Sequence, residues 1–444
     1  MHLKSFIGNR ITGPRDYKYI KILRFFLRFV SGWPLKEFGE KMLFCEGKYQ
    51  GLYNTGLSIL FFIAQVWYMA EHAAHLSFVE LGHMYVSTLM NMVCCLLSVS
   101  KDYKSLAIRF LTETHMFFHK DRSDYSRQIY FKVHRLCNWV TGYLVTMFLV
   151  ACVLFCAVPP YINYKKGKFQ TLADPVNTTY ELSLYFKLPF DPERSFRGYC
   201  YSLALNWCVT LTNPTDIIHV KVRMDFWMYA AFLCGTSILM FDLFLSILIF
   251  NLWGHFKILL HSLATFPIPK ALQGGGSTSI QRDATLYSPQ EQDMVTEILK
   301  DNIRYHRMII NFTNQMSEAF GMVLFLYYTF HQVSGCLLLL ECFQGPEALA
   351  RYLPLTVLMT AQLIQISIVF EIIGSMSEKI KDGVYCVPWE YMNTKNRKTV
   401  LLFLINVQEP VHIKAGGLVD VGVTTMAGIL KATFTYFAFL RTMN

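Results

Sequence analysis

Near its C-terminus the chain reads Glu409-Pro410-Val411-His412-Ile413-Lys414-Ala415-Gly416-Gly417, and an apolar run from Leu418 to Leu440 follows. This run is long enough to cross a bilayer as a helix. Threonines interrupt it, and Lys431 lies near its centre. A cation at the bilayer centre costs about 2.5–3.5 kcal/mol or more, so Lys431 should face protein or water. The stretch predicts a helix with one polar face, which suits either a pore wall or the interior of a helix bundle.

The composition of the whole chain indicates a membrane protein. Of the 444 residues, 53% are hydrophobic and only 16% are charged, a combination that soluble domains rarely have. The net charge of +10 does not indicate nucleic-acid binding, because the basic residues lie mainly between apolar runs, where cytoplasmic loops place them. The twelve cysteines form neither a CxxC pair nor a Cys/His metal pattern.

No motif of an enzyme is present. The sequence contains no nucleotide-binding glycine loop, no nucleophile elbow and no metal-ligand spacing. We therefore expect no catalytic residues, no cofactor and no metal.

The apolar runs predict an all-α membrane protein with seven transmembrane helices. Six lie at about 52–70, 78–98, 137–158, 226–252, 320–342 and 352–375, and the seventh is the C-terminal run. Pro159-Pro160 should end the third. Residues 198–223 are ambiguous, because their apolar part is short and polar residues follow it.

Loop charges predict the orientation. Ten Lys and Arg precede the first span, none lie in the first link, and eight lie from Lys101 to Arg135. The positive-inside rule then puts the N-terminus in the cytoplasm and, after seven spans, the C-terminus outside. The loop 161–197 violates the rule with six Lys and Arg. In the same outer loop, Asn177 begins a glycosylation sequon.

Four regions follow from this topology. We expect a cytoplasmic segment at 1–51, helices one to six at 52–375, a cytoplasmic segment at 376–416, and the last helix at 417–444. Residues 18–29 mix cations and aromatics as an interfacial helix does. Thr399–Val407 is a half-length helix, too short to span.

Several motifs resemble those of insect odorant receptors. The most specific is the C-terminal pattern, with Pro410, the Lys414-Ala415-Gly416 step, the stretch from Ile429 to Phe437, and Leu440-Arg441. Here threonine and phenylalanine replace some of the serines and tyrosines typical of that family. Further matches resemble the moth sex-pheromone subgroup: Trp253-Gly254-His255, Leu340-Glu341-Cys342 and Pro388-Trp389-Glu390. The co-receptor of the family has a longer insertion before span five, so the chain resembles a tuning subunit.

The resemblance implies a ligand-gated, non-selective cation channel in the plasma membrane of olfactory sensory neuron dendrites. Four subunits, including the co-receptor, would form a heterotetramer around one pore that is lined by the last helices. The cytoplasmic segment with its half-length helix would anchor the subunits to one another. The partners would then be the co-receptor, membrane lipid, permeant cations and a small apolar volatile, with no nucleic acid.

The resemblance places the ligand pocket among the outer halves of spans two, three, four and six. A fatty alcohol, aldehyde or acetate would be held by dispersion and one or two hydrogen bonds. Each candidate is equally compatible with ordinary helix packing. The candidates are Tyr85, Thr88, Thr146, Phe148, Cys152, Phe232, Thr356, Met359 and Gln362.

Thr435, Phe439 and Met443 follow an i, i+4, i+8 spacing, so they share one face of the last helix. At the outer mouth of a pore, Phe439 and Met443 would close it by hydrophobic dewetting. The alternative is that both pack against a neighbouring span.

Two other classes of function stay open. A transporter should have internal repeats with interrupted helices, and none are visible in the sequence. A G-protein-coupled receptor would have its N-terminus outside, opposite to the orientation that the loop charges predict.

Overall fold

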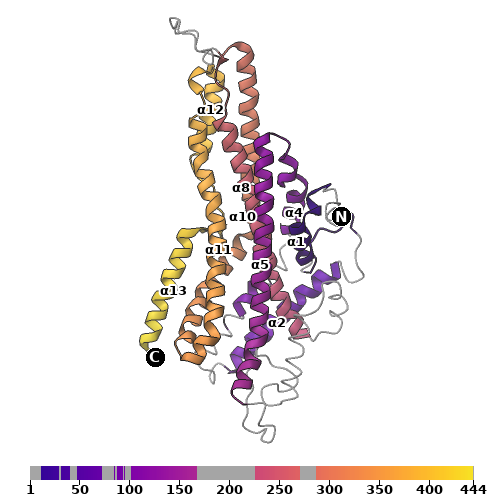
Figure 1. Cartoon of the computed structure of the whole chain (residues 1–444), viewed down its shortest axis with the longest axis vertical. Coiled ribbons are helices and arrows are strands. Elements are labelled where there is room, and N and C mark those ends of the chain that lie inside the picture. Colours follow the sequence, from indigo (N-terminus) through magenta and orange to yellow (C-terminus); the bar gives the residue numbers. More distant parts are fainter. Residues whose placement is uncertain are drawn as a thin grey trace, which may run out of the picture.

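A computed structural model describes residues 12–29, 32–40, 48–72, 85, 88–93, 95, 102–167, 226–270 and 287–443. Long helices run side by side along the longest axis of the molecule (Figure 1). The predicted all-α membrane fold is therefore confirmed, and the number of spans and their orientation stay predictions. Most of the second predicted span, the ambiguous residues 198–223 and the sequon at Asn177 lie outside the described residues.

The described elements are mostly helical. The α-helices are α1 (Lys18–Phe29), α2 (Lys48–His72), α4 (Asp102–Arg109), α5 (Asp124–Lys165), α8 (Phe226–Ala264), α10 (Pro289–Cys342), α11 (Pro346–Tyr385), α12 (Thr394–Asn406) and α13 (Val423–Met443). The short turns of helix are η1 (Pro14–Asp16), η2 (Phe110–Thr114), η3 (Met116–His119) and η5 (Trp389–Tyr391). Two strands, β1 (Lys414–Ala415) and β2 (Val419–Asp420), form an antiparallel pair.

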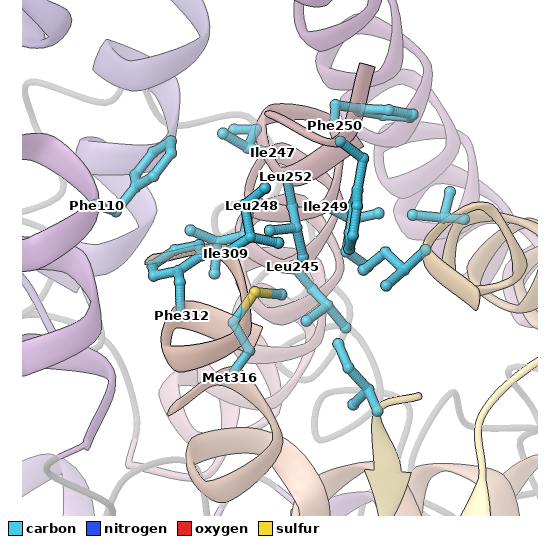
Figure 2. Packing of buried hydrophobic residues seen from close by; sticks show 14 of the residues in the cluster. Phe110, Leu245, Ile247, Leu248, Ile249, Phe250, Leu252, Ile309, Phe312 and Met316 are labelled. Carbon is cyan, nitrogen blue, oxygen red and sulfur yellow. The ribbon is translucent and has the colours of Figure 1, made fainter. Parts of the chain in front are cut away.

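Helix α8 is the centre of the bundle. It packs against α5, α10 and α11, and 94% of its most apolar stretch is buried. The corresponding share is 22% in α5 and 28% in α11, so these helices keep an outward face. Figure 2 shows side chains of α8 such as Leu245 and Leu248 among Ile309, Phe312 and Met316 of α10. Between helices in lipid, such close packing is the main source of attraction.

Four described helices are long and apolar enough to cross a membrane: 124–153, 235–264, 289–342 and 352–391. Helix α2, which covers the first predicted span, and α13 are not among them.

Three predicted boundaries were wrong. Helix α5 continues through Pro159-Pro160 to Lys165, since proline costs a helix a backbone hydrogen bond without preventing helical φ. The fifth predicted span, 320–342, is only the second part of a longer helix, α10, which begins at Pro289. The last helix begins at Val423, because Gly416 and Gly417 adopt φ of 59° and 72° and turn the chain into the β1–β2 hairpin.

Helix α1 also differs from its predicted place on the lipid surface. Its apolar face packs on α8 and α5, and Ile20, Leu23 and Leu27 are almost fully buried. The periodicity of the sequence identified the buried face correctly, but protein covers it instead of lipid.

The link between α12 and α13 is held tightly on α10 and α11. Gly416 N donates to Gly321 O at 2.7 Å, and Val411 N donates to Ser377 Oγ at 2.9 Å. Glu371 Oε2 of α11 accepts from Val423 N at 3.0 Å and so caps the first turn of α13. A carboxylate at a helix N-terminus also interacts favourably with the helix dipole. The inner end of α13 is thereby fixed to its own bundle.

The glycine at position 374 of α11 makes room for this link. A Cβ built there would lie 2.7 Å from His412 Cε1, closer than side chains approach. We predict that Gly374→Ala lowers the midpoint of thermal unfolding in detergent by several degrees, since overpacking costs about 1–3 kcal/mol.

Gly142→Ala in α5 is the matched control, because nothing lies within 4 Å of its added methyl group. Alanine has the higher helix propensity, so this variant should unfold at the wild-type temperature or above it. Equal midpoints for the two variants would contradict the close contact at Gly374.

Candidate functional site

The structure places the predicted ligand residues on four helical segments. Thr146, Phe148 and Cys152 lie on α5, and Thr356, Met359 and Gln362 lie on α11. Tyr85 and Thr88 lie in the short described helical pieces of the second span. Phe232 is on α8, and its side chain is outside the described part of the chain.

Several of these residues meet other elements of the bundle. Phe148 packs at Gly235 of α8, where an added Cβ would lie 3.3 Å from its ring. Thr88 Oγ1 lies 3.9 Å from Met69 Sδ of α2. Tyr85 and Thr146 are exposed in the single chain. Thr356 donates back to Tyr352 O at 2.9 Å, and its Oγ1 lies 3.6 Å from Cys342 Sγ.

Gln362 belongs to a buried polar cluster that the sequence reading missed. Its Nε2 donates to Asp242 Oδ2 of α8, and Tyr327 OH of α10 donates to the same oxygen at 3.3 Å. Asp242 is 1% exposed. One carboxyl group therefore joins the three central helices. A lone acidic residue between Phe241 and Leu243, inside an apolar run, was the signal in the sequence.

Further polar contacts continue along the same three helices. Gln365 Nε2 of α11 donates to Ser246 Oγ of α8 at 3.3 Å. The rings of Tyr327 and His331 on α10 lie 4.4 Å apart. Residues three or four apart share one face of a helix, so these groups stand one turn away from the Asp242 contacts. The bundle thus contains a buried column of polar groups between apolar layers.

Helix α13 has two unlike faces. On the buried face, Thr433 is packed against Gly335 of α10, and the rings of Phe437 and Phe343 lie 4.9 Å apart. The guanidinium of Arg441 lies over the Phe343 ring. Figure 1 shows the helix at the edge of the bundle beside α11. One side of α13 is therefore covered by its own chain.

The opposite side of α13 carries its polar residues and is exposed. Their positions in the sequence are seven, four and seven residues apart, so their side chains form one stripe along the helix. The stripe consists of Thr424, Lys431, Thr435 and Thr442. Phe439, next to the stripe, is 59% exposed. The side chain of Met443 is outside the described residues, so the predicted gate pair is seen only in part.

A second buried polar region fixes the loop that leads into α5. His115 Nε2 lies 3.0 Å from Tyr19 OH of α1, and its Nδ1 accepts from Phe117 N at 3.1 Å. Met116 N donates to Asn251 Oδ1 of α8 at 3.1 Å. His255 of α8 joins Thr114 O at 2.6 Å to Tyr305 OH at 2.7 Å. These bonds tie the loop to α1, α8 and α10.

Burial, together with the smaller effects of the neighbouring His255, His134 and His119, lowers the pKa of His115 to about 3. Tyr17 and Tyr19 stack beside the ring and are neutral. Among the described residues, no group of three His, Cys, Asp or Glu side chains could hold a metal ion. The histidines here are therefore packing and hydrogen-bonding groups.

The neutral His115 makes stability depend on pH. Its folded pKa lies below the unfolded value of about 6.5, so its contribution is complete above pH ~6.5 and is lost as the pH falls towards 3. We predict that the detergent-solubilised protein loses about 2 kcal/mol of stability from this group between pH 7 and pH 5.

His115→Asn should flatten this slope, measured as the unfolding midpoint at several pH values. Met116→Leu is the control, because it alters the next buried residue without removing a titrating group. An unchanged slope in His115→Asn would contradict the assignment.

The bundle of long apolar helices defines a multi-pass membrane protein. The sequence model of the 7tm odorant receptor family matches residues 221–434, which include α8 to α13 up to Phe434. Over these residues the chain is similar to the 7tm odorant receptor family, which is a family of receptors.

Known proteins agree with this assignment. Odorant receptors 85c and 85b of Drosophila melanogaster are each 21% identical over 150 residues, which cover 33% of this chain and 39% and 38% of those relatives. The olfactory receptor OR5 of Machilis hrabei has the same fold, with a TM-score of 0.68 at 14% identity. That comparison covers 96% of this chain and 98% of OR5. OR5 has also been solved in complex with eugenol.

Proposed function

We propose that this odorant receptor is a tuning subunit of a ligand-gated, non-selective cation channel. In this proposal a small volatile binds in the outer half of the bundle and opens a pore lined by α13. The single observation that carries it is the exposed polar stripe of α13, which points away from the chain's own bundle. The plasma membrane of olfactory neuron dendrites is the proposed location.

The stripe argues for a wet surface on α13. Lys431 is exposed near the middle of a helix whose other face packs on α10 and α11. Facing lipid there would cost about 2.5–3.5 kcal/mol or more. A water-filled pore removes this cost and also suits the hydroxyls of Thr435 and Thr442. Phe439 and Met443 would then form the apolar constriction at the outer mouth.

A heterotetramer with the co-receptor would supply the other walls of the pore. The exposed face of α12 supports such an assembly, because Leu401, Leu402 and Ile405 are 56%, 61% and 59% exposed. Apolar side chains grouped on one helix near the cytoplasmic end are typical of a contact between subunits. The segment 376–416 would thus be the anchor, between the ligand-binding helices 52–375 and the pore helix 417–444. Residues 1–51 would be cytoplasmic.

The proposed ligand is a long-chain alcohol, aldehyde or acetate, as a pheromone receptor would bind. The eugenol complex of OR5 supports a small volatile as the class of ligand. Each buried methylene gains about 0.8 kcal/mol, so chain length is recognised mainly by dispersion and burial. Phe148 and Gln362 are candidates that contact the central helix α8, and Met359 lies on α11 three residues before Gln362.

The first experiment is to record current from cells that express the chain with and without the co-receptor. A panel of fatty alcohols, aldehydes and acetates should evoke cation current only from the pair. Current that requires G-protein signalling, or solute uptake without conductance, would support the alternatives of a coupled receptor or a transporter.

We further predict that Thr435→Cys makes the odorant-evoked current sensitive to a charged, water-soluble thiol reagent. Thr435 is on the exposed stripe, so its thiol should react when the pore is open. Covalent charge in the pore should change the current at least twofold.

Thr433→Cys is the matched control. It is the same substitution two residues away, on the buried face, where the side chain is 5% exposed. Equal modification of both cysteines, or modification of neither, would contradict a pore lined by the stripe.

A further inference from the structure

The carboxyl group of Asp242 has an oxygen with no hydrogen-bond partner. Oδ2 accepts from Tyr327 and Gln362, while Oδ1 has no partner among the described residues. Both donors are neutral side chains. A buried polar atom without a partner raises the free energy of the folded state, so such atoms are rare unless they have a function.

Two more atoms without partners in the described part of the chain belong to the same column. Gln365 Oε1 of α11 lies one turn from Gln362, and His331 Nε2 of α10 lies one turn from Tyr327. The Nε2 of Gln365 already donates to Ser246. Its carbonyl oxygen is an acceptor and needs a donor. Three central helices therefore each contribute one unsatisfied polar atom to one buried region.

This region adjoins the predicted ligand pocket. Met359 and Gln362 lie on the same part of α11. Gly235, which packs on Phe148, lies two turns from Asp242 on α8. A chain-like ligand that contacts Phe148 and Met359 would therefore reach Asp242 at its inner end.

We infer that Asp242 is the head-group site of the odorant pocket and that it takes the hydroxyl of a long-chain alcohol. This inference rests on the proposed function. A hydroxyl both donates and accepts, whereas an aldehyde or an acetate only accepts. It fits Asp242 Oδ1 in either protonation state and can donate to the carbonyl of Gln365. Tyr327 and Gln362 are positioning residues, because they hold the carboxyl group through its other oxygen.

The test measures half-maximal concentrations for an alcohol and an acetate of equal chain length on cells expressing the chain with its co-receptor. The wild type should prefer the alcohol. Asp242→Leu should reduce the alcohol-to-acetate preference about tenfold, which corresponds to loss of one hydrogen bond of about 1.4 kcal/mol. Asp242→Asn, which can still donate and accept, should keep the preference within about threefold.

Asp382→Leu is the matched control, since it removes an exposed carboxylate of α11 near the cytoplasmic end. It should leave the preference unchanged. A purely structural role of Asp242 would weaken both ligands equally and leave the ratio intact, and that result overturns the inference.

Surface labelling checks that each variant reaches the membrane. If Asp242→Leu does not, Tyr327→Phe is measured instead, because it removes only the hydroxyl that holds Oδ2. It should shift the ratio about threefold, and an unchanged ratio overturns the inference. A wild type that prefers the acetate also overturns it, while a wild type that gives no current with any member of the panel refutes the proposed function itself.

Discussion

A lysine in an apolar helix must be kept away from lipid, and the arrangement of α13 depends on how this is done. The helix gives Ile429 and Thr433 to its own bundle and turns Lys431 and Thr435 outwards. On the side of α13 that faces α10, the methyl group of Thr433 packs against Gly335. The polar stripe is therefore exposed on the single chain, and the water-filled pore that we propose would keep Lys431 away from lipid.

The same helices support the buried polar column and the base of α13. On α11, Gln362 binds Asp242, and Glu371, nine residues further on, caps α13. On α10, Tyr327 reaches Asp242, and Gly321 receives the link before α13. A ligand that moves α10 or α11 would therefore act directly on the end of α13 that Glu371 caps. It would open the pore only if it binds the open state more tightly than the closed state.

The sequence was sufficient for the fold class, the apolar runs and the family, because hydropathy and the C-terminal motif are local signals. It was insufficient for helix ends. Pro159-Pro160 did not end α5. Gly416 and Gly417 have positive φ and form the turn of the hairpin that precedes α13, so α13 begins at Val423. The role of Asp242 was missed because its partners are 85 and 120 residues away, a distance that periodicity does not cover. Gln362 was predicted as a ligand-binding residue; the structure shows its side chain on Asp242, and its contact with a ligand stays a prediction.

The charge of Lys431 gives the most direct test that α13 lines the pore. A fixed positive charge on the wall repels permeant cations, and the effect is large where water is confined. The single-channel cation conductance of Lys431→Gln, recorded with the co-receptor, should exceed that of the wild type, and the difference should shrink at high salt. A conductance equal to that of the wild type at low and at high salt would contradict the account.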